Sequence, residues 1–297
     1  MSRLQTSTPA RLHHLHLTSE DPKALARFYV ELMDLTPTEI AGGAILLRGG
    51  LRSLQVSRGP SRALAWSAYA LADDAALARL RARLAADGFG ARDMHSMLPI
   101  QAPLFGDGAF VVADPQGRRV VFGVPADDNA SPVVRDGRRD ARRDVHPARM
   151  QHVVFQTTEL DAMVAFYSGR LGFTVSDRVV EEDGSLAVCF MRSDDEHHSV
   201  AFFRGARNEL DHHCYETDGW MDIRDWGDRF ARVRIPIFFG PGRHGPGDNL
   251  FFMVNDPDGN KVELSAEIEI VKADKPAGVW PQSEYTLNSW GRAWMRS

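Results

Sequence analysis

Cysteine is scarce in this chain, and neither long apolar runs nor an excess of positive charge are found in it. The 297 residues include 2 cysteines, Cys189 and Cys214, too few for a disulfide framework, so we expect reduced thiols. No apolar run approaches the roughly 20 residues of a membrane span, and the first residues lack the apolar core of a signal peptide. The net charge is -5, so the chain has no excess of positive charge with which to bind nucleic acid or an anionic membrane. We therefore expect a cytoplasmic protein that binds neither nucleic acid nor membrane.

The chain contains an internal repeat. The segment LHHLHLTSEDPKALARFYVELMDLTP in the first half parallels MQHVVFQTTELDAMVAFYSGRLGFTV in the second. Each predicts an alternating strand with a histidine near its start, then a polar turn and an amphipathic helix that carries Phe-Tyr. His14 and Phe28 have the same separation as His152 and Phe166, so the two copies are in register.

The two copies also end alike, with FVVADPQGRRVVFGVP in the first and FFMVNDPDGNKVELSAE in the second. Each predicts a strand, a DP-x-G turn and a second strand, because Pro fixes one backbone angle and Gly supplies a positive one. A helix is expected between the ends of each copy, at ALARLRARLAADG and at MDIRDWGDRFARV. A repeat of this length predicts two similar α+β domains rather than a solenoid, whose repeats are much shorter.

The repeat and the composition divide the chain into four parts. We assign an N-terminal domain, a linker, a C-terminal domain and a tail to residues 1–124, 125–148, 149–270 and 271–297. The linker is polar and charge-rich and has no apolar period. Its arginines suggest either a phosphate or nucleic-acid site or a solvated connection, and the interleaved aspartates favour the connection.

The copies share a scaffold but differ in polar chemistry. Glu263 lies seven residues past Asp256, whereas the place seven residues past Asp114 holds Val121. The segment ALAWSAYAL corresponds to LDHHCYET and holds no histidine. Polar groups at strand positions that can be apolar cost free energy to bury unless they are paired or bound to a metal. The second copy therefore predicts a polar site that the first lacks, although each of its histidines alone also fits an ordinary surface or core position.

Three side chains of the second copy suggest a metal site. They are a histidine at a strand start, one of a histidine pair, and a carboxylate on the last strand: His152, His212 or His213, and Glu263. Two neutral imidazoles and one carboxylate form the facial triad of non-haem Fe(II) oxygenases, which leaves three octahedral positions open. Neighbours on a strand point to opposite faces, so only one histidine of the pair can be a ligand.

These motifs resemble those of the type I extradiol catechol dioxygenases of the vicinal oxygen chelate superfamily. The resemblance rests on His152, the histidine pair, DEHHSVAFF and GPGRHGPGDNLFFMVNDPDGNKVELSAE, and covers the chain from about Arg11 to about Glu267. It implies an α+β fold of two tandem domains, each built of paired βαβββ modules. It also implies a non-catalytic first domain, an Fe(II) site, with Mn(II) possible, in the second, and a homo-oligomer.

The resemblance implies roles for single residues. The metal ligands fall on His152, His212 and Glu263, because His212 has the family's step to the following aromatic-Glu pair. His198 matches the family's acid/base histidine; without the resemblance it reads as a surface histidine. His213 would then face the other side of the sheet.

Four more positions match the family's substrate pocket. His244 would hydrogen-bond the substrate hydroxyl, and Val154 and Phe190 would line the aromatic ring, although both also fit simple core packing. Met253 stands where many relatives carry a tyrosine, and methionine has no hydroxyl to donate. Arg243 is the one arginine near this motif that could meet a carboxylated ring.

The implied function is Fe(II)-dependent extradiol cleavage of a small aromatic vicinal diol with O2, which yields a ring-opened semialdehyde or keto-acid. Two alternatives stay open: a glyoxalase-like metal-dependent isomerase or transferase, and a non-catalytic aromatic-binding protein of the same superfamily. The sequence does not identify the aromatic substrate. The tryptophan-rich tail, with Arg292 and Arg296, is expected either to cover the pocket or to make a subunit contact.

Overall fold

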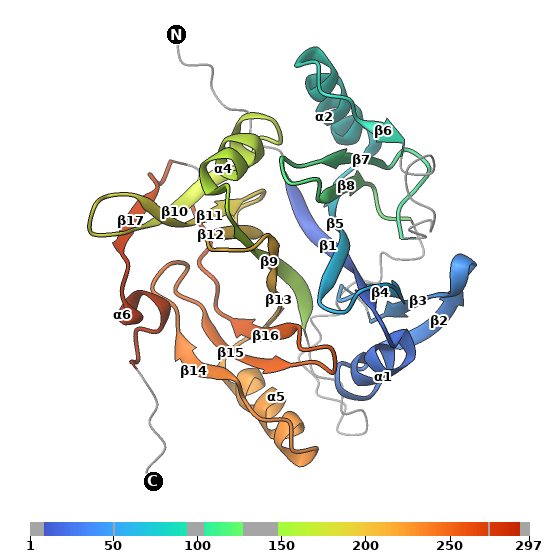
Figure 1. Ribbon diagram of the computed structural model, residues 1–297, viewed down its shortest axis with the longest axis vertical. Helices are drawn as coiled ribbons and strands as arrows, with labels where there is room; N and C mark the ends of the chain where they lie inside the picture. The colour runs from blue at the N-terminus through green and yellow to red at the C-terminus, as the bar shows by residue number, and fades with distance from the viewer. Residues whose placement is uncertain (1–8, 50, 94–103, 127–147, 273, 292–297) are drawn as a thin grey trace.

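The structure is a computed structural model that describes residues 9–49, 51–93, 104–126, 148–272 and 274–291. Most of the predicted linker, together with Arg292 and Arg296, lies outside these residues. Each half of the chain forms its own β-sheet, and the two sheets lie side by side with helices at the periphery (Figure 1). Within the described ranges no helix combines the length and the apolar character that a membrane crossing requires.

The first half forms an eight-stranded sheet in the order β2-β3-β4-β1-β5-β8-β7-β6. Helix α1 begins where the Asp21 carboxylate accepts a hydrogen bond from the Ala24 amide, and α2 begins in the same way at Asp73. The elements are β1 (Ala10–Ser19), α1 (Pro22–Leu32), β2 (Thr36–Ile40), the 3-10 turn η1 (Ala41–Gly43), β3 (Ala44–Arg48), β4 (Leu54–Arg58), β5 (Ala63–Leu71), α2 (Asp74–Ala86), β6 (Arg92–Asp93), β7 (Phe110–Ala113) and β8 (Arg119–Gly123).

The second half forms a nine-stranded sheet in the order β14-β15-β16-β13-β9-β12-β11-β10-β17. This order repeats that of the first sheet, with β17 added outside β10. The elements are β9 (Arg149–Thr157), α4 (Leu160–Gly169), β10 (Thr174–Val180), β11 (Leu186–Arg192), β12 (Val200–Arg204), β13 (Glu209–Thr217), α5 (Trp220–Arg232), β14 (Phe239–Arg243), β15 (Leu250–Asn255), β16 (Lys261–Ala266), β17 (Gly278–Pro281) and α6 (Glu284–Leu287).

Strand register shows the duplication residue by residue. Cys214 of β13 pairs with His152 of β9 on one side and with Glu263 of β16 on the other. The same pairing in the first sheet joins Ala68 of β5 to two further residues, His14 and Val121. The two copies therefore place different side chains on one backbone geometry.

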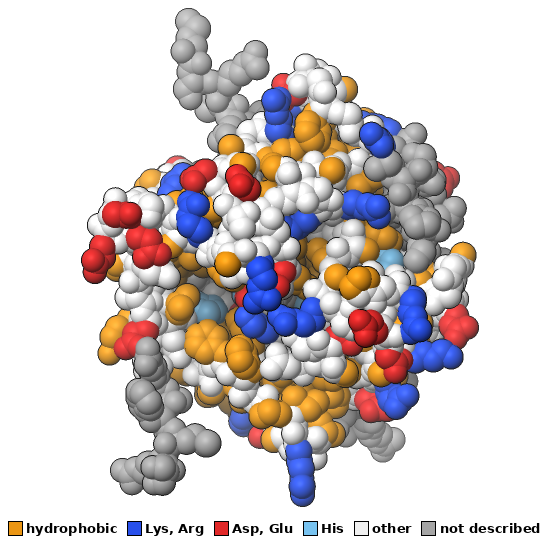
Figure 2. Space-filling model, in the orientation of Figure 1, with side chains coloured by type: hydrophobic (Ala, Val, Ile, Leu, Met, Phe, Trp, Pro, Cys, Tyr) orange, Lys and Arg blue, Asp and Glu red, His pale blue; other side chains and the backbone are white. Residues whose placement is uncertain are grey.

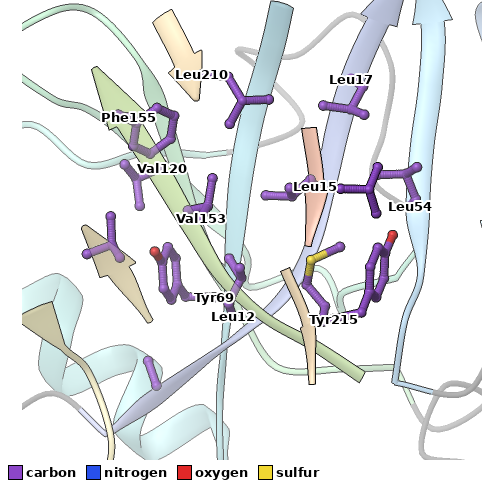
Figure 3. Packing of buried hydrophobic residues seen from close by; sticks show 14 of the residues in the cluster. Leu12, Leu15, Leu17, Leu54, Tyr69, Val120, Val153, Phe155, Leu210 and Tyr215 are labelled. Atoms are coloured by element: carbon purple, nitrogen blue, oxygen red, sulfur yellow. The ribbon is translucent and has the colours of Figure 1, made fainter. Parts of the chain in front are cut away.

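A shared hydrophobic core fills the space between the two sheets (Figure 3). Leu15 and Leu17 of β1 belong to the same buried cluster as Val153 and Phe155 of β9. Burying each such side chain stabilises the fold by about 1.5–3 kcal/mol. Because side chains alternate along a strand, facing Val153 and Phe155 into this core turns His152 and Val154 to the opposite face of the sheet.

His213 lies on the side of β13 that faces the first half of the chain. The Tyr29 hydroxyl of α1 lies 3.1 Å from His213 Nε2 and donates a hydrogen bond to Asp256 Oδ2 at 3.0 Å. All three side chains are buried. His213 therefore connects the two halves of the chain, which gives the second histidine of the pair a structural role.

Replacing Tyr29 with phenylalanine is expected to destabilise the protein by about 1–2 kcal/mol, because Asp256 and His213 lose a buried partner. Urea unfolding measures this change. The matched control is Tyr215→Phe, since the Tyr215 hydroxyl is also buried but has no hydrogen-bond partner. Equal stability of the two variants would contradict a role for the Tyr29 hydroxyl between the halves.

Candidate active site

A cavity of ≈ 320 Å³ lies in the second half, on the face of the sheet turned away from the shared core. In the space-filling view hydrophobic side chains surround a hollow beside β14 and α6, with a histidine visible inside it (Figure 2). All eight site residues expected from the sequence line this one cavity: His152, Val154, Phe190, His198, His212, His244, Met253 and Glu263.

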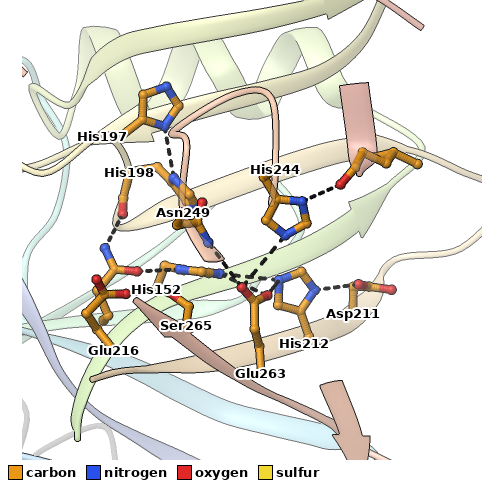
Figure 4. A network of polar contacts seen from close by, with 12 residues as sticks. His152, His197, His198, Asp211, His212, Glu216, His244, Asn249, Glu263 and Ser265 are labelled. Carbon is orange, nitrogen blue, oxygen red and sulfur yellow. Dashed lines mark hydrogen bonds and ion pairs between the residues drawn. The ribbon is translucent and has the colours of Figure 1, made fainter. Parts of the chain in front are cut away.

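Three of these side chains converge on one point, from the adjacent strands β9, β13 and β16 (Figure 4). His212 Nε2 lies 3.1 Å from Glu263 Oε2, and His152 Nε2 lies 3.6 Å from the same oxygen. The two imidazole Nε2 atoms are 3.3 Å apart. Glu263 Oε2 is buried, and its polar neighbours are the Nε2 atoms of these two histidines.

The outer nitrogens of both histidines are held by neighbouring side chains. The Gln151 amide donates to the His198 carbonyl at 2.7 Å, which leaves its oxygen to accept from His152 Nδ1. His212 Nδ1 donates to Asp211 Oδ2 at 2.6 Å. Each Nε2 therefore presents a lone pair to the other, an arrangement that is stable only with a proton or a cation between them. The donor set fits a divalent metal ion.

The charges agree with this interpretation. Burial raises the pKa of Glu263, but charges and hydrogen bonds of His152, His212 and His244 outweigh it and hold that pKa well below its usual value. Burial lowers the pKa of His152. Burial also lowers the pKa of His212, but hydrogen bonds and charges from Asp211 and Glu263 outweigh burial and raise that pKa to about 9. Without a cation, a proton on His212 compensates the carboxylate.

Cys214 is a further group at this point, which sequence reasoning missed. Its sulfur lies within 4.8 Å of ligand atoms of His152 and Glu263. Cys214 is two residues past His212 on β13, so alternation along the strand could have found it. Burial raises the pKa of the Cys214 thiol well above its usual value, and a neutral thiol is a poor ligand. His212 Nε2 lies 3.1 Å from Glu263 Oε2 and 3.3 Å from His152 Nε2, so His212 belongs to the same group.

His244 and His198 lie beside the three converging side chains. His244 Nε2 is 3.8 Å from Glu263 Oε1, its ring stacks on Phe251 at 3.7 Å, and its Nδ1 donates to the Leu287 carbonyl at 2.6 Å. The His198 ring centroid lies 4.3 Å from that of His152. Burial lowers the pKa of His198 well below its usual value, so its imidazole is neutral.

The chain is similar to known proteins in sequence and in fold. Residues 149–264 match the model of the Glyoxalase/Bleomycin resistance protein/Dioxygenase superfamily. This match lies in the second half of the chain, which is therefore similar to proteins of that superfamily. It is 29% identical to Metapyrocatechase 2 of Cupriavidus necator over 152 residues, a match that covers 50% of this chain and 45% of that protein. The chain therefore matches less than half the length of this relative.

Solved structures share the fold over nearly the whole chain. Homoprotocatechuate 2,3-dioxygenase from Arthrobacter globiformis superposes with a TM-score of 0.78 at 23% identity, covering 97% of this chain and 91% of that one. A Mn(II)-bound glyoxalase from Novosphingobium aromaticivorans superposes with a TM-score of 0.77 at 23% identity, covering 95% and 91%. The predicted α+β fold of two tandem vicinal-oxygen-chelate domains is confirmed.

The chain has no side-chain hydroxyl at position 253, which is Met253. Met253 is paired in the sheet with Glu263, so its thioether lies beside the converging side chains. Arg243 is not part of the cavity lining, because its guanidinium donates to Glu267 and to the Asp248 carbonyl. Among the residues that the structure describes, the cavity lining therefore contains neither a tyrosine nor Arg243.

The C-terminal segment completes the cavity wall. Strand β17 pairs with β10, and Thr286 and Leu287 of α6 line the cavity. The Gly245 amide donates to the Thr286 carbonyl at 3.0 Å. Of the two roles open for the tail, its described part covers the pocket; sequence patterning could not show this, because the contacts span about forty residues of chain.

Proposed function

We propose that this chain is a metal-dependent extradiol dioxygenase, which opens the ring of a catechol-type diol beside its hydroxyls and places both atoms of O2 in the product. The proposal rests mainly on the convergence of His152 Nε2, His212 Nε2 and the Glu263 carboxylate inside a largely apolar cavity. Two further histidines in the same cavity supply groups that bind the diol and move its protons.

The proposed cofactor is Fe(II), with Mn(II) as the second candidate, held by His152, His212 and Glu263. A metal bound there supplies a redox-active Lewis acid with open positions. Gln151 and Asp211 would keep both imidazoles in the ligating orientation, since each fixes the outer nitrogen of its neighbour.

The chain's own residues bind the diol and handle its protons. Phe190 and Val154 form apolar walls against which an aromatic ring can pack. His244 donates from Nδ1 to a backbone carbonyl, so its Nε2 is an acceptor that can take a hydrogen bond from a substrate hydroxyl. His198 is the proposed general acid and base, and its neutral imidazole can accept a proton from the diol and return it to the product.

The lining favours a diol with an apolar substituent. Its two cations are already paired: Arg204 with Asp161 at 3.0 Å and Lys261 with Asp211 at 2.6 Å. Glu181 adds a further carboxylate to the lining. A substrate carboxylate would meet negative charge without a free partner, at a desolvation cost of several kcal/mol.

Oxygen uptake by the anaerobically Fe(II)-reconstituted protein tests the proposal, with coloured ring-opened product as the second readout. Methylcatechol and dihydroxybiphenyl are expected to be consumed, with kcat/KM at least about tenfold above that for dihydroxyphenylacetate, because only the last carries a carboxylate. Faster turnover of the carboxylated diol would refute the substrate assignment. Absence of uptake with every diol would refute the dioxygenase itself.

A second candidate is a glyoxalase-like isomerase, favoured by the similarity to the Mn(II)-bound glyoxalase. The same three ligands would serve it, but dioxygen would not be consumed. Metal loading without oxygen uptake, combined with isomerisation of a hemithioacetal, would support that alternative. Tight binding of an aromatic ligand without any bound metal would instead indicate a non-catalytic binding protein.

A further inference from the structure

A second histidine, His197, lies directly behind His198 in the segment between β11 and β12. Both side chains are buried, and their Nδ1 atoms are 3.0 Å apart (Figure 4). On its other side, His197 Nε2 lies 3.0 Å from Asp177 Oδ2 of β10. A carboxylate and two imidazoles thus form a continuous buried row that ends at the cavity.

Asp177 is fixed in this row by the C-terminal strand. The Gly278 amide donates to Asp177 Oδ1 at 2.9 Å, and Trp280 Nε1 donates to Oδ2 at 2.8 Å. Burial raises the pKa of Asp177, but its contacts with His197, Trp280 and Gly278 outweigh it and lower that pKa below its usual value. Asp177 is therefore an ionised carboxylate near neutral pH, and it can accept hydrogen bonds but not donate them.

His197, like Asp177, is fixed by its surroundings. Its backbone amide donates to the Glu269 carbonyl at 2.9 Å. A side chain at Gly247 would meet His197 Nδ1 at 2.9 Å, so the glycine is what lets this loop close over the ring. The ring has no room to turn away from Asp177 and His198.

We propose that Asp177 and His197 are positioning residues that set the tautomer of His198, an inference that rests on the proposed function. The negative Asp177 carboxylate 3.0 Å from His197 Nε2 favours the tautomer with the proton on Nε2, which presents the Nδ1 lone pair to His198. His198 then carries its proton on Nδ1 and turns an unprotonated Nε2 to the cavity. In that form His198 is ready to accept the proton that a bound diol must lose.

One consequence concerns the C-terminal segment. The same stretch that holds Asp177 through Gly278 and Trp280 also orients His244 through the Leu287 carbonyl. Both proposed proton-handling histidines therefore depend on one segment that also forms a wall of the cavity.

The substitution Asp177→Asn tests the proposal, because an amide nitrogen can donate to His197 Nε2 and reverse both tautomers. We expect kcat to fall at least about tenfold, as when the orienting carboxylate of a catalytic triad becomes an amide. KM for the diol and the Fe(II) content should stay within about twofold, since neither substrate contacts nor ligands change. A loss of stability alone would lower kcat and metal content together.

A matched pair at His197 separates the tautomer from packing. His197→Gln keeps an acceptor for His198 Nδ1 and should retain most of kcat, whereas His197→Leu fills similar space without an acceptor and should lose it. Equal kcat in the two variants overturns the proposal. This pair also stands in if Asp177→Asn does not fold.

The second readout needs no activity. In nitrogen-15 labelled, metal-free protein, the ring shifts of His198 should show the proton on Nδ1, and in Asp177→Asn they should show it on Nε2. A wild-type His198 protonated on Nε2 overturns the inference. Unmodified protein that consumes no diol removes the proposed function, yet the tautomer result still decides whether the Asp177–His197 row sets His198.

Discussion

Replacing Glu263 with glutamine is expected to lower Fe(II) affinity and turnover by at least about 100-fold, above the range for removing a partner outside the ligand set. The physical reason is the loss of the one negative charge that faces two imidazole lone pairs. An amide has the same shape, but it presents a neutral oxygen to the cation. Metal analysis after anaerobic reconstitution, followed by oxygen uptake with a consumed diol, measures both effects.

The matched control is Glu182→Gln, the same chemical change at an exposed position outside the cavity lining. It should keep full metal content and turnover. Should Glu263→Gln also keep both, Glu263 is not a ligand, and Cys214 or another group must hold the metal. The outcome with metal retained but turnover lost would place Glu263 in the chemistry and not in binding.

The fold of the two domains was predictable because the sequence contains an internal repeat. Alternating strands, the Phe-Tyr helix and the DP-x-G turn recur in order, and each depends only on local periodicity and turn chemistry. The helices expected at ALARLRARLAADG and MDIRDWGDRFARV form as α2 and α5. Strand β17 was not predicted, because it pairs with β10 about a hundred residues away and has no apolar pattern of its own.

The site was predictable only where the two copies differ. The polar positions of the second copy stood out because Val121 takes the place of Glu263 in the first copy and because β5 contains no histidine. The orientation of His213 follows from strand alternation, but its partner Tyr29 lies in the other half of the chain and needed the structure. Asp177 and His197 were missed for the same reason, since a contact between β10 and a loop leaves no local signal.

The first domain carries other side chains at the positions that correspond to the candidate ligands. His14 occupies the place of His152, but Trp66 and Val121 stand at the places of the other two ligands expected from the sequence. The neighbouring His16 is buried against Trp66, with ring centroids 3.9 Å apart, and its Nε2 is 2.7 Å from Ser57 Oγ. With no carboxylate at these positions, the histidines here are stable only as neutral rings.

Acid should therefore destabilise the wild-type protein through His16. Burial, and then the charge of Arg119, lower the pKa of His16 to about 3, against about 6.5 in an unfolded chain. Between these values the unfolded chain holds a proton that the folded protein lacks, so stability is present above about pH 6.5 and falls as the pH falls. The contribution of this one group is about 1.4 kcal/mol per pH unit.

The substitution His16→Gln isolates that contribution. Between about pH 6.5 and pH 4.5 the wild type should lose about 2 kcal/mol of unfolding free energy relative to the variant. Urea unfolding at several pH values measures this change. The control Ser57→Ala removes only the hydrogen-bond partner of His16, so its unfolding free energy should change with pH as that of the wild type does. If the difference between wild type and His16→Gln does not change with pH, His16 has the same pKa in the folded and unfolded chain, which contradicts a neutral buried ring.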